Sequence, residues 1–175
     1  MQVFLIRHPS PRLAAGICYG QLDVDCENPQ PIAVRLHQRI PPETPIFSSP
    51  LKRARLLAEV LARLSGAALN VDARLSEIDF GDWEGKAWEE IDRAALDAWA
   101  SDVLNFVPPG GESVARLRDR AIEFADALAT LALPRVAIVS HAGVMRSLVG
   151  YWQHLPNEAW TRLEFPFGGL NEITV

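Results

Sequence analysis

The chain has 175 residues, of which 49% are hydrophobic, and a formal net charge of −5 at pH 7. This length is enough for a hydrophobic core and too short to divide comfortably, so we expect one domain over residues 1–175. The acidic charge argues against nucleic acid or an anionic membrane as the main partner, and no stretch approaches the roughly 20 apolar residues of a membrane span.

The cysteine content favours a cytoplasmic protein. Cys18 and Cys26 are the only cysteines, and they form no framework of disulfide spacings. Residues 1–6 are apolar but too few for the core of a signal peptide, and Arg7 and His8 end the run. A zinc site made from the two cysteines and a histidine would need unusual spacing, so we expect no metal.

Strands and helices are predicted to alternate along the chain. Residues 3–6 and 136–139 are continuous apolar runs, which are typical of interior strands in a sheet covered on both faces. Ser49 and Pro50 resemble an N-cap and a first helical residue, and Gly66 resembles the end of that helix. The remaining patterns predict a loop at 9–30, helices at 31–39, 83–100, 113–131 and 143–152, and strands at 45–48, 69–73 and 171–175. Such alternation indicates an α/β fold, a three-layer sandwich whose mostly parallel central sheet is covered by helices on both faces.

Each of the two strong strands is followed by a histidine. His8 comes after the first run, and His141 comes after the second. Ligands of open α/β sheets bind beyond the carboxyl ends of the strands. We therefore expect both imidazoles to face one crevice, an arrangement that favours catalysis over a structural role.

The other polar residues near these strand ends suit an anion. Arg7 precedes His8, and Arg53 lies on the first turn of the second predicted helix, where free backbone N–H groups already favour an anion. Ala142, at the start of the helix after His141, can offer such a group as well. Two guanidiniums and a helix N-terminus suit bidentate recognition of phosphate.

The sequence has no serine-hydrolase or nucleotide-binding signature. A Gly-x-Ser-x-Gly elbow, a Walker A run and a Gly-x-Gly-x-x-Gly loop are all absent. Histidine itself can form a covalent intermediate. A neutral His8 whose other ring nitrogen binds a backbone carbonyl would be able to attack phosphorus in line.

Five motifs together resemble a known family. They are Arg7-His8, SSPLKRA at 48–54, LSEIDFGDWEG at 75–85, GGES at 110–113 and SHAG at 140–143. In this order they resemble the histidine phosphatase superfamily, in its phosphoglycerate-mutase-like branch, over about residues 2–150.

The resemblance implies a phosphomonoesterase that works through a phosphohistidine. His8 would be the phosphorylated nucleophile and Glu77 the proton donor to the leaving oxygen, with Asp82 as the second candidate for this acid. The groups that would hold the phosphoryl group are Arg7, Arg53, Ala142 and His141, the last of which also counts as catalytic. No metal or other cofactor is implied, because protein side chains supply the charge. The implied partner is a small-molecule phosphate ester.

A narrower likeness concerns the loop at 16–23. It resembles a segment of α-ribazole phosphatases, enzymes of cobalamin nucleotide-loop assembly, so α-ribazole 5'-phosphate is the favoured substrate. Two positions depart from the wider family: Pro9 replaces the usual glycine and removes a backbone donor, and Ala14 stands where many mutases have an asparagine. The candidate substrate contacts are Cys18, Tyr19, Gly20, Trp83, Glu112 and Ser113.

Plainer roles and other functions stay open at this point. Trp83, Cys18 and Tyr19 also fit packing roles, and Glu112 and Ser113 also fit the start of a helix. A phosphosugar or phosphoglycerate phosphatase or mutase is the second enzymatic hypothesis. A module that binds a phosphorylated ligand without catalysis is the third. The oligomeric state does not follow from the sequence.

Overall fold

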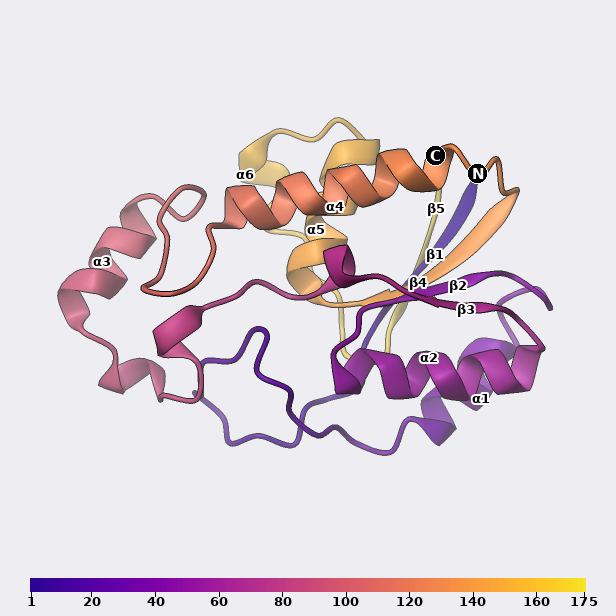
Figure 1. Ribbon diagram of the computed structural model, residues 1–175, viewed down its shortest axis with the longest axis horizontal. Coiled ribbons are helices and arrows are strands. Elements are labelled where there is room, and N and C mark those ends of the chain that lie inside the picture. Colours follow the sequence, from indigo (N-terminus) through magenta and orange to yellow (C-terminus); the bar gives the residue numbers. More distant parts are fainter.

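Five strands form the central sheet in the order β3-β2-β4-β1-β5 (Figure 1). They belong to a computed structural model that describes residues 1–175. All neighbouring pairs are parallel except β1 with β5, which confirms the predicted mostly parallel sheet. The strands are β1 (Gln2–Arg7), β2 (Ile46–Ser48), β3 (Leu69–Val71), β4 (Arg135–Ser140) and β5 (Leu170–Thr174).

Helices cover both faces of this sheet, as the sequence predicts. Alternate side chains of a strand point to opposite faces, so Leu5 packs with one set of helices and Ile6 with the other. Leu5 belongs to the core under α4 (Val114–Ala129) and α5 (Ala142–Trp152). Ile6 belongs to the core over α1 (Gln30–His37) and α2 (Lys52–Ser65). The continuous apolar strands are therefore explained by burial on both sides.

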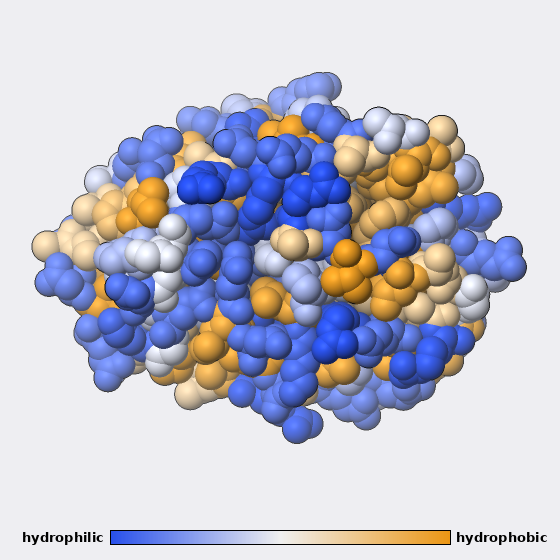
Figure 2. All heavy atoms as spheres, in the orientation of Figure 1, coloured by the Kyte–Doolittle hydropathy of each residue, from blue (hydrophilic) through white to orange (hydrophobic).

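The outer surface is mixed in character. Figure 2 shows hydrophilic residues over most of one face, with hydrophobic residues in smaller groups. None of the helices has the length and apolarity that crossing a bilayer requires. The short α6 (Asn157–Trp160), which the sequence patterns do not predict, packs against α5.

The helix predicted at 83–100 is wrong in its first half. Helix α3 spans only Arg93–Ser101, and the segment before it makes 3₁₀ turns at Gly81–Trp83 and Trp88–Glu90. The chain reverses between these turns at Gly85, whose φ of 82° suits glycine. The tryptophans pack on one another instead of along a helix: the rings of Trp88 and Trp99 stack with centroids 5.6 Å apart. Aromatic packing thus overrides the local helical pattern.

The predicted N-cap of the second helix is also wrong. Helix α2 begins at Lys52 with Leu51 as its N-cap residue, and no side chain caps it from that position. The Ser49 hydroxyl is instead shared between the Leu51 N–H and the ring of His141. The Lys52 N–H donates to Asp23 Oδ1 at 2.7 Å, so the loop at 9–30 supplies an acceptor for the first turn.

Strand register brings the two histidines together. Arg7 of β1 lies opposite Ser140 of β4, so the residues that follow, His8 and His141, leave the sheet at the same edge. The His8 N–H donates to the Ser140 carbonyl at 3.0 Å, which ties the two strand ends together. This edge of the sheet forms the floor of the site described next.

Candidate active site

His8 and His141 face each other beyond the ends of β1 and β4. Their ring centroids are 4.9 Å apart with an interplanar angle of 54°. His8 is 2% exposed and His141 is fully buried. The structure thus places both imidazoles at one edge of the sheet, as expected, but only His8 lines the cavity described below.

The hydrogen bonds of His8 fix its protonation state. Its Nδ1 lies 2.6 Å from the carbonyl oxygen of Pro9. A carbonyl only accepts, so Nδ1 carries the hydrogen and Nε2 presents a lone pair. Arg53 Nε donates toward this nitrogen at 3.4 Å. Pro9 thus orients the ring through its carbonyl. Proline lacks the backbone N–H of the family's usual glycine, but this contact does not need it.

Burial keeps the His8 ring neutral. Loss of solvation, reinforced by the positive charge of Arg53, lowers the pKa of His8 to about 3. Burial and the same guanidinium also lower the pKa of His141 well below its usual range. Both imidazoles are therefore uncharged near neutral pH.

This shift predicts how stability varies with pH. Between pH 6.5, the pKa of a solvated histidine, and pH 3, the unfolded chain binds a proton at residue 8 that the folded chain does not. The free energy of unfolding should therefore fall as pH drops through this window. In urea unfolding between pH 4.5 and 7.5, the free energy of unfolding of His8→Asn should fall less steeply with decreasing pH than that of the wild type. The control His154→Asn changes an exposed histidine. Identical pH dependence in wild type and His8→Asn would contradict the burial argument.

His141 has a defined tautomer as well. Its Nε2 lies 2.8 Å from Ser49 Oγ, which also accepts the Leu51 N–H at 3.2 Å. The Ser49 hydroxyl has no other acceptor, so its proton goes to Nε2 and leaves the hydrogen of His141 on Nδ1. That nitrogen is buried without a partner. A buried N–H of this kind is a donor available to a ligand oxygen.

Two arginines place positive charge beside His8. The terminal nitrogens of Arg53 donate to the carbonyls of Leu22 and Gly20 at 3.0 and 2.5 Å, and the side chain is fully buried. Arg7 donates to the Phe165 carbonyl at 2.7 Å, and its Nε is buried without a partner. Burial lowers the pKa of both guanidiniums, and neither forms an ion pair with a carboxylate. Two partly desolvated cations without an anion suit a phosphate.

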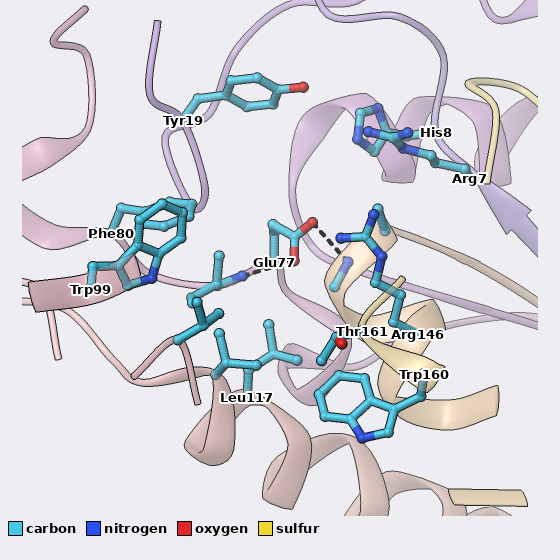
Figure 3. A pocket seen from close by; sticks show the side chains of 15 residues that line it. Arg7, His8, Tyr19, Glu77, Phe80, Trp99, Leu117, Arg146, Trp160 and Thr161 are labelled. Carbon is cyan, nitrogen blue, oxygen red and sulfur yellow. Dashed lines mark hydrogen bonds between the residues drawn. The ribbon is translucent and has the colours of Figure 1, made fainter. Parts of the chain in front are cut away.

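Glu77 lies across the site from His8, as Figure 3 shows. Its carboxylate accepts the N–H of Ile78 at 3.0 Å and that of Gly143, on the first turn of α5, at 3.2 Å. A Cβ on Gly143 would lie 2.3 Å from a Glu77 oxygen, so only glycine allows this approach. Asp82, the second candidate for the acid, is exposed and lies outside the cavity.

Arg7, His8 and Glu77 line a cavity of about 360 Å³, whereas Arg53 and His141 are fully buried and are not among its lining residues. In Figure 3 the polar end holds Arg7 and His8, and the opposite side is formed by hydrophobic and aromatic side chains. Glu77 lies between the two parts. Nowhere in the chain do three or more His, Cys, Asp or Glu side chains form a group able to hold a metal ion. The residues of the apolar side include Phe80, Trp99, Val103, Val114, Leu117 and Trp160.

Comparison with known proteins agrees with this geometry. The sequence profile of the histidine phosphatase superfamily (branch 1) matches residues 3–175. The chain belongs to this superfamily. The match covers nearly the whole chain and all five motifs, so the resemblance seen in the sequence is confirmed.

Individual relatives of this histidine phosphatase have several substrates in their names. The glucosyl-3-phosphoglycerate phosphatase of Mycolicibacterium vanbaalenii is 31% identical over 188 residues, covering 99% of this chain and 81% of that protein. A solved mycobacterial glucosyl-3-phosphoglycerate phosphatase with VO3 has a TM-score of 0.85 at 26% identity, covering 99% of this chain and 90% of the other. The α-ribazole phosphatase of Shigella flexneri has a TM-score of 0.89 at 23% identity, covering 100% and 91%, and shows the fold. A catalytic protein is therefore supported over a binding module.

The candidate substrate contacts fall into two groups in the histidine phosphatase structure. Tyr19 lines the cavity, as does Ala142 of the phosphate-binding set. The other five candidate contacts are not among the residues that line the cavity. Cys18 and Trp83 pack in the aromatic cluster, Gly20 binds Arg53 through its carbonyl, Ser113 caps α4, and the Glu112 carboxylate pairs with Arg120.

Several cavity residues have no motif in the sequence. Arg146 lies four residues after Ala142 on α5, so helical spacing would have placed it on the same face. Phe167, which is not among the lining residues, stacks under Arg7, whose guanidinium carbon lies 3.8 Å from the ring centroid. Trp160 and Thr161 reach the cavity from α6 and the residue after it. No local pattern predicts these last contacts, because they depend on how the chain returns to the sheet.

Proposed function

We propose that this histidine phosphatase hydrolyses phosphomonoesters in two steps through a phosphate bound to His8. The observation that supports this most strongly is the unprotonated Nε2 of His8, oriented by Pro9 and lying beside Arg53. In the first step the Nε2 lone pair attacks phosphorus and the ester P–O bond breaks. Glu77 gives its proton to the leaving oxygen.

The second step reverses the role of Glu77. Its carboxylate takes a proton from water as the water oxygen attacks phosphorus, and the N–P bond breaks. Inorganic phosphate leaves, His8 regains its lone pair and Glu77 regains its proton. During both steps Arg7, Arg53 and the Nδ1–H of His141 stabilise the charge on the phosphoryl oxygens.

The proposed substrate is α-ribazole 5'-phosphate of cobalamin assembly. The apolar side of the cavity supports this choice, since the leaving group carries a flat benzimidazole ring that Phe80 and Trp99 can contact. Tyr19 of the Cys18-Tyr19-Gly20 segment also lines the cavity. The proposed location is the cytoplasm, where both buried cysteines would remain reduced.

A comparison of matched substrates tests this proposal. Burial of roughly 120 Å² of apolar ring at about 25 cal/mol per Å² is worth about 3 kcal/mol, or about 10²-fold. We expect kcat/KM for α-ribazole 5'-phosphate to exceed that for ribose 5-phosphate, which lacks the base, by about this factor. Trp99→Leu should reduce the advantage about tenfold and leave ribose 5-phosphate within about twofold. Equal kcat/KM values for the two esters in the wild type would rule out recognition of the base.

Arg146 favours a second candidate, an ester whose leaving group carries an anion. Its Nε donates to the Leu163 carbonyl at 2.7 Å, and its terminal nitrogens have no protein acceptor. A phosphoglycerate-type leaving group would supply a carboxylate for them. Measuring kcat/KM for 3-phosphoglycerate beside the two esters above tests this candidate. A higher kcat/KM for 3-phosphoglycerate that is lost in Arg146→Gln would select it.

A further inference from the structure

The acid of the proposed mechanism lies on a segment without regular structure. Residues 76–80 form neither helix nor strand, yet they carry Glu77 into the cavity. A proton donor has to lie within about 2.6–3.2 Å of the atom that it protonates. Something outside this segment must therefore fix its backbone.

Arg120 of α4 holds this segment through its backbone carbonyls. One terminal nitrogen donates to the carbonyls of Arg74 and Ser76 at 2.8 and 2.6 Å. The other donates to the carbonyl of Glu77 itself at 2.9 Å. Three carbonyls thus converge on one planar guanidinium, which is a rigid fork of donors.

Glu112 completes the arrangement from the other side. Its Oε1 accepts from Arg120 at 2.6 Å and from the N–H of Asp79 at 3.1 Å. The Glu112 N–H also donates to the Asp79 carbonyl at 2.8 Å. A Cβ on Gly111 would lie 2.4 Å from that carbonyl, so glycine permits this close approach of the two loops.

The pair is mostly buried and lies outside the lining of the cavity. The side chains of Arg120 and Glu112 are 18% and 15% exposed, and neither lines the cavity. Both Glu112 oxygens accept hydrogen bonds from Arg120, so they are occupied within the protein. This arrangement suits an internal support better than a substrate contact.

We propose that Arg120 and Glu112 are positioning residues that hold Glu77 at the leaving oxygen, which rests on the proposed role of Glu77 as the acid. The phosphate-binding groups come from other elements, namely the ends of β1 and β4 and the start of α2. A displacement of the 76–80 segment by about 1 Å is enough to cost about 10²-fold in a positioned step. Loss of the pair should therefore impair protonation of the leaving group and leave the phosphate site intact.

Leaving-group dependence separates this role from a general structural one. Arg120→Lys keeps the charge and loses the fork, and Glu112→Gln keeps the size and loses the charge. We expect either change to lower kcat/KM for an alkyl ester, ribose 5-phosphate, by about 10–100-fold. For p-nitrophenyl phosphate, whose leaving oxygen departs as a stable anion, kcat/KM should change less than about threefold. Arg74→Lys is the control, because that side chain pairs with Asp72, the N-cap residue of its own turn, and with the Glu123 carbonyl, and donates no hydrogen bond to residues 76–80.

The double variant Arg120→Lys/Glu77→Gln supplies the second test. It should lose little more than Glu77→Gln alone on the alkyl ester, because positioning has no value once the proton is gone. An equal loss on both esters, no loss on either, or a full additional loss in the double variant would overturn the positioning role. If Glu77→Gln itself shows no leaving-group dependence, the proposed acid is wrong. A selective effect of Glu77→Gln without one of Arg120→Lys or Glu112→Gln rejects only the positioning role.

Discussion

His8→Asn is expected to lower kcat/KM for every phosphomonoester by at least about 10⁴-fold. Asparagine can still donate a hydrogen bond toward the Pro9 carbonyl, but it provides no lone pair at the position of Nε2. The arginines proposed to bind phosphate remain in place, so inorganic phosphate should still bind within about tenfold of its wild-type affinity. Steady-state assays with ribose 5-phosphate and p-nitrophenyl phosphate measure kcat/KM, and calorimetric titration with inorganic phosphate measures binding.

His154→Asn is the matched control for this change. His154 is exposed and has a φ of 52°, a conformation that asparagine tolerates well. It should retain full activity. Residual turnover of His8→Asn within about 10²-fold of the wild type would show that another group is the nucleophile.

Glu77→Gln is expected to slow hydrolysis of alkyl esters by about 10²–10⁴-fold, the usual contribution of a general acid. Glutamine can accept only one of the N–H groups of Ile78 and Gly143, because these bind different oxygens of Glu77. The backbone of the segment should still keep its place, since Arg120 holds it through the carbonyls of Arg74, Ser76 and Glu77. The variant lacks the proton that an alkoxide needs in order to leave. For p-nitrophenyl phosphate kcat/KM should therefore stay within a few fold of the wild type. This comparison uses kcat/KM, because that ratio covers the step in which the leaving group departs.

Two variants delimit the result for Glu77. Asp82→Asn should leave both esters unchanged, since Asp82 is exposed and outside the cavity. Arg53→Ala should slow both esters alike, because every phosphoryl transfer develops charge that this guanidinium stabilises. Leaving-group dependence in Asp82→Asn instead of Glu77→Gln would assign the acid to Asp82. If neither variant showed leaving-group dependence, His141 would be the next candidate for the acid.

The sequence predicts the parts of the fold that depend on local patterns. The apolar runs that became β1 and β4 identify buried strands, and the residues after them place His8 and His141 at one edge. Helix α4 begins at Val114, one residue after the predicted start, because Ser113 caps it through a hydrogen bond to the Arg116 N–H. Short-range chemistry of this kind is visible in the order of residues.

Contacts between distant segments are not visible in the same way. The helical pattern after Trp83 fails because its tryptophans stack on one another and on Phe106, which lies outside the predicted helix. The motif residue Glu112 is expected at the substrate, but its carboxylate pairs with Arg120, eight residues away on the next helix. Arg146, an arginine that lines the cavity, has no motif of its own. The candidate catalytic residues thus follow from motifs, and the walls of the cavity follow from tertiary packing.

Isolation of the phosphorylated enzyme tests the two-step mechanism most directly. Enzyme mixed with a phosphomonoester should be quenched under denaturing alkaline conditions, which preserve phosphohistidine, and the peptide that contains residue 8 sequenced by mass spectrometry. The account predicts phosphate on His8, stable in base and lost in acid, and absent from His8→Asn. Phosphate on a serine or an aspartate, or label on His8→Asn equal to that on the wild type, would contradict it.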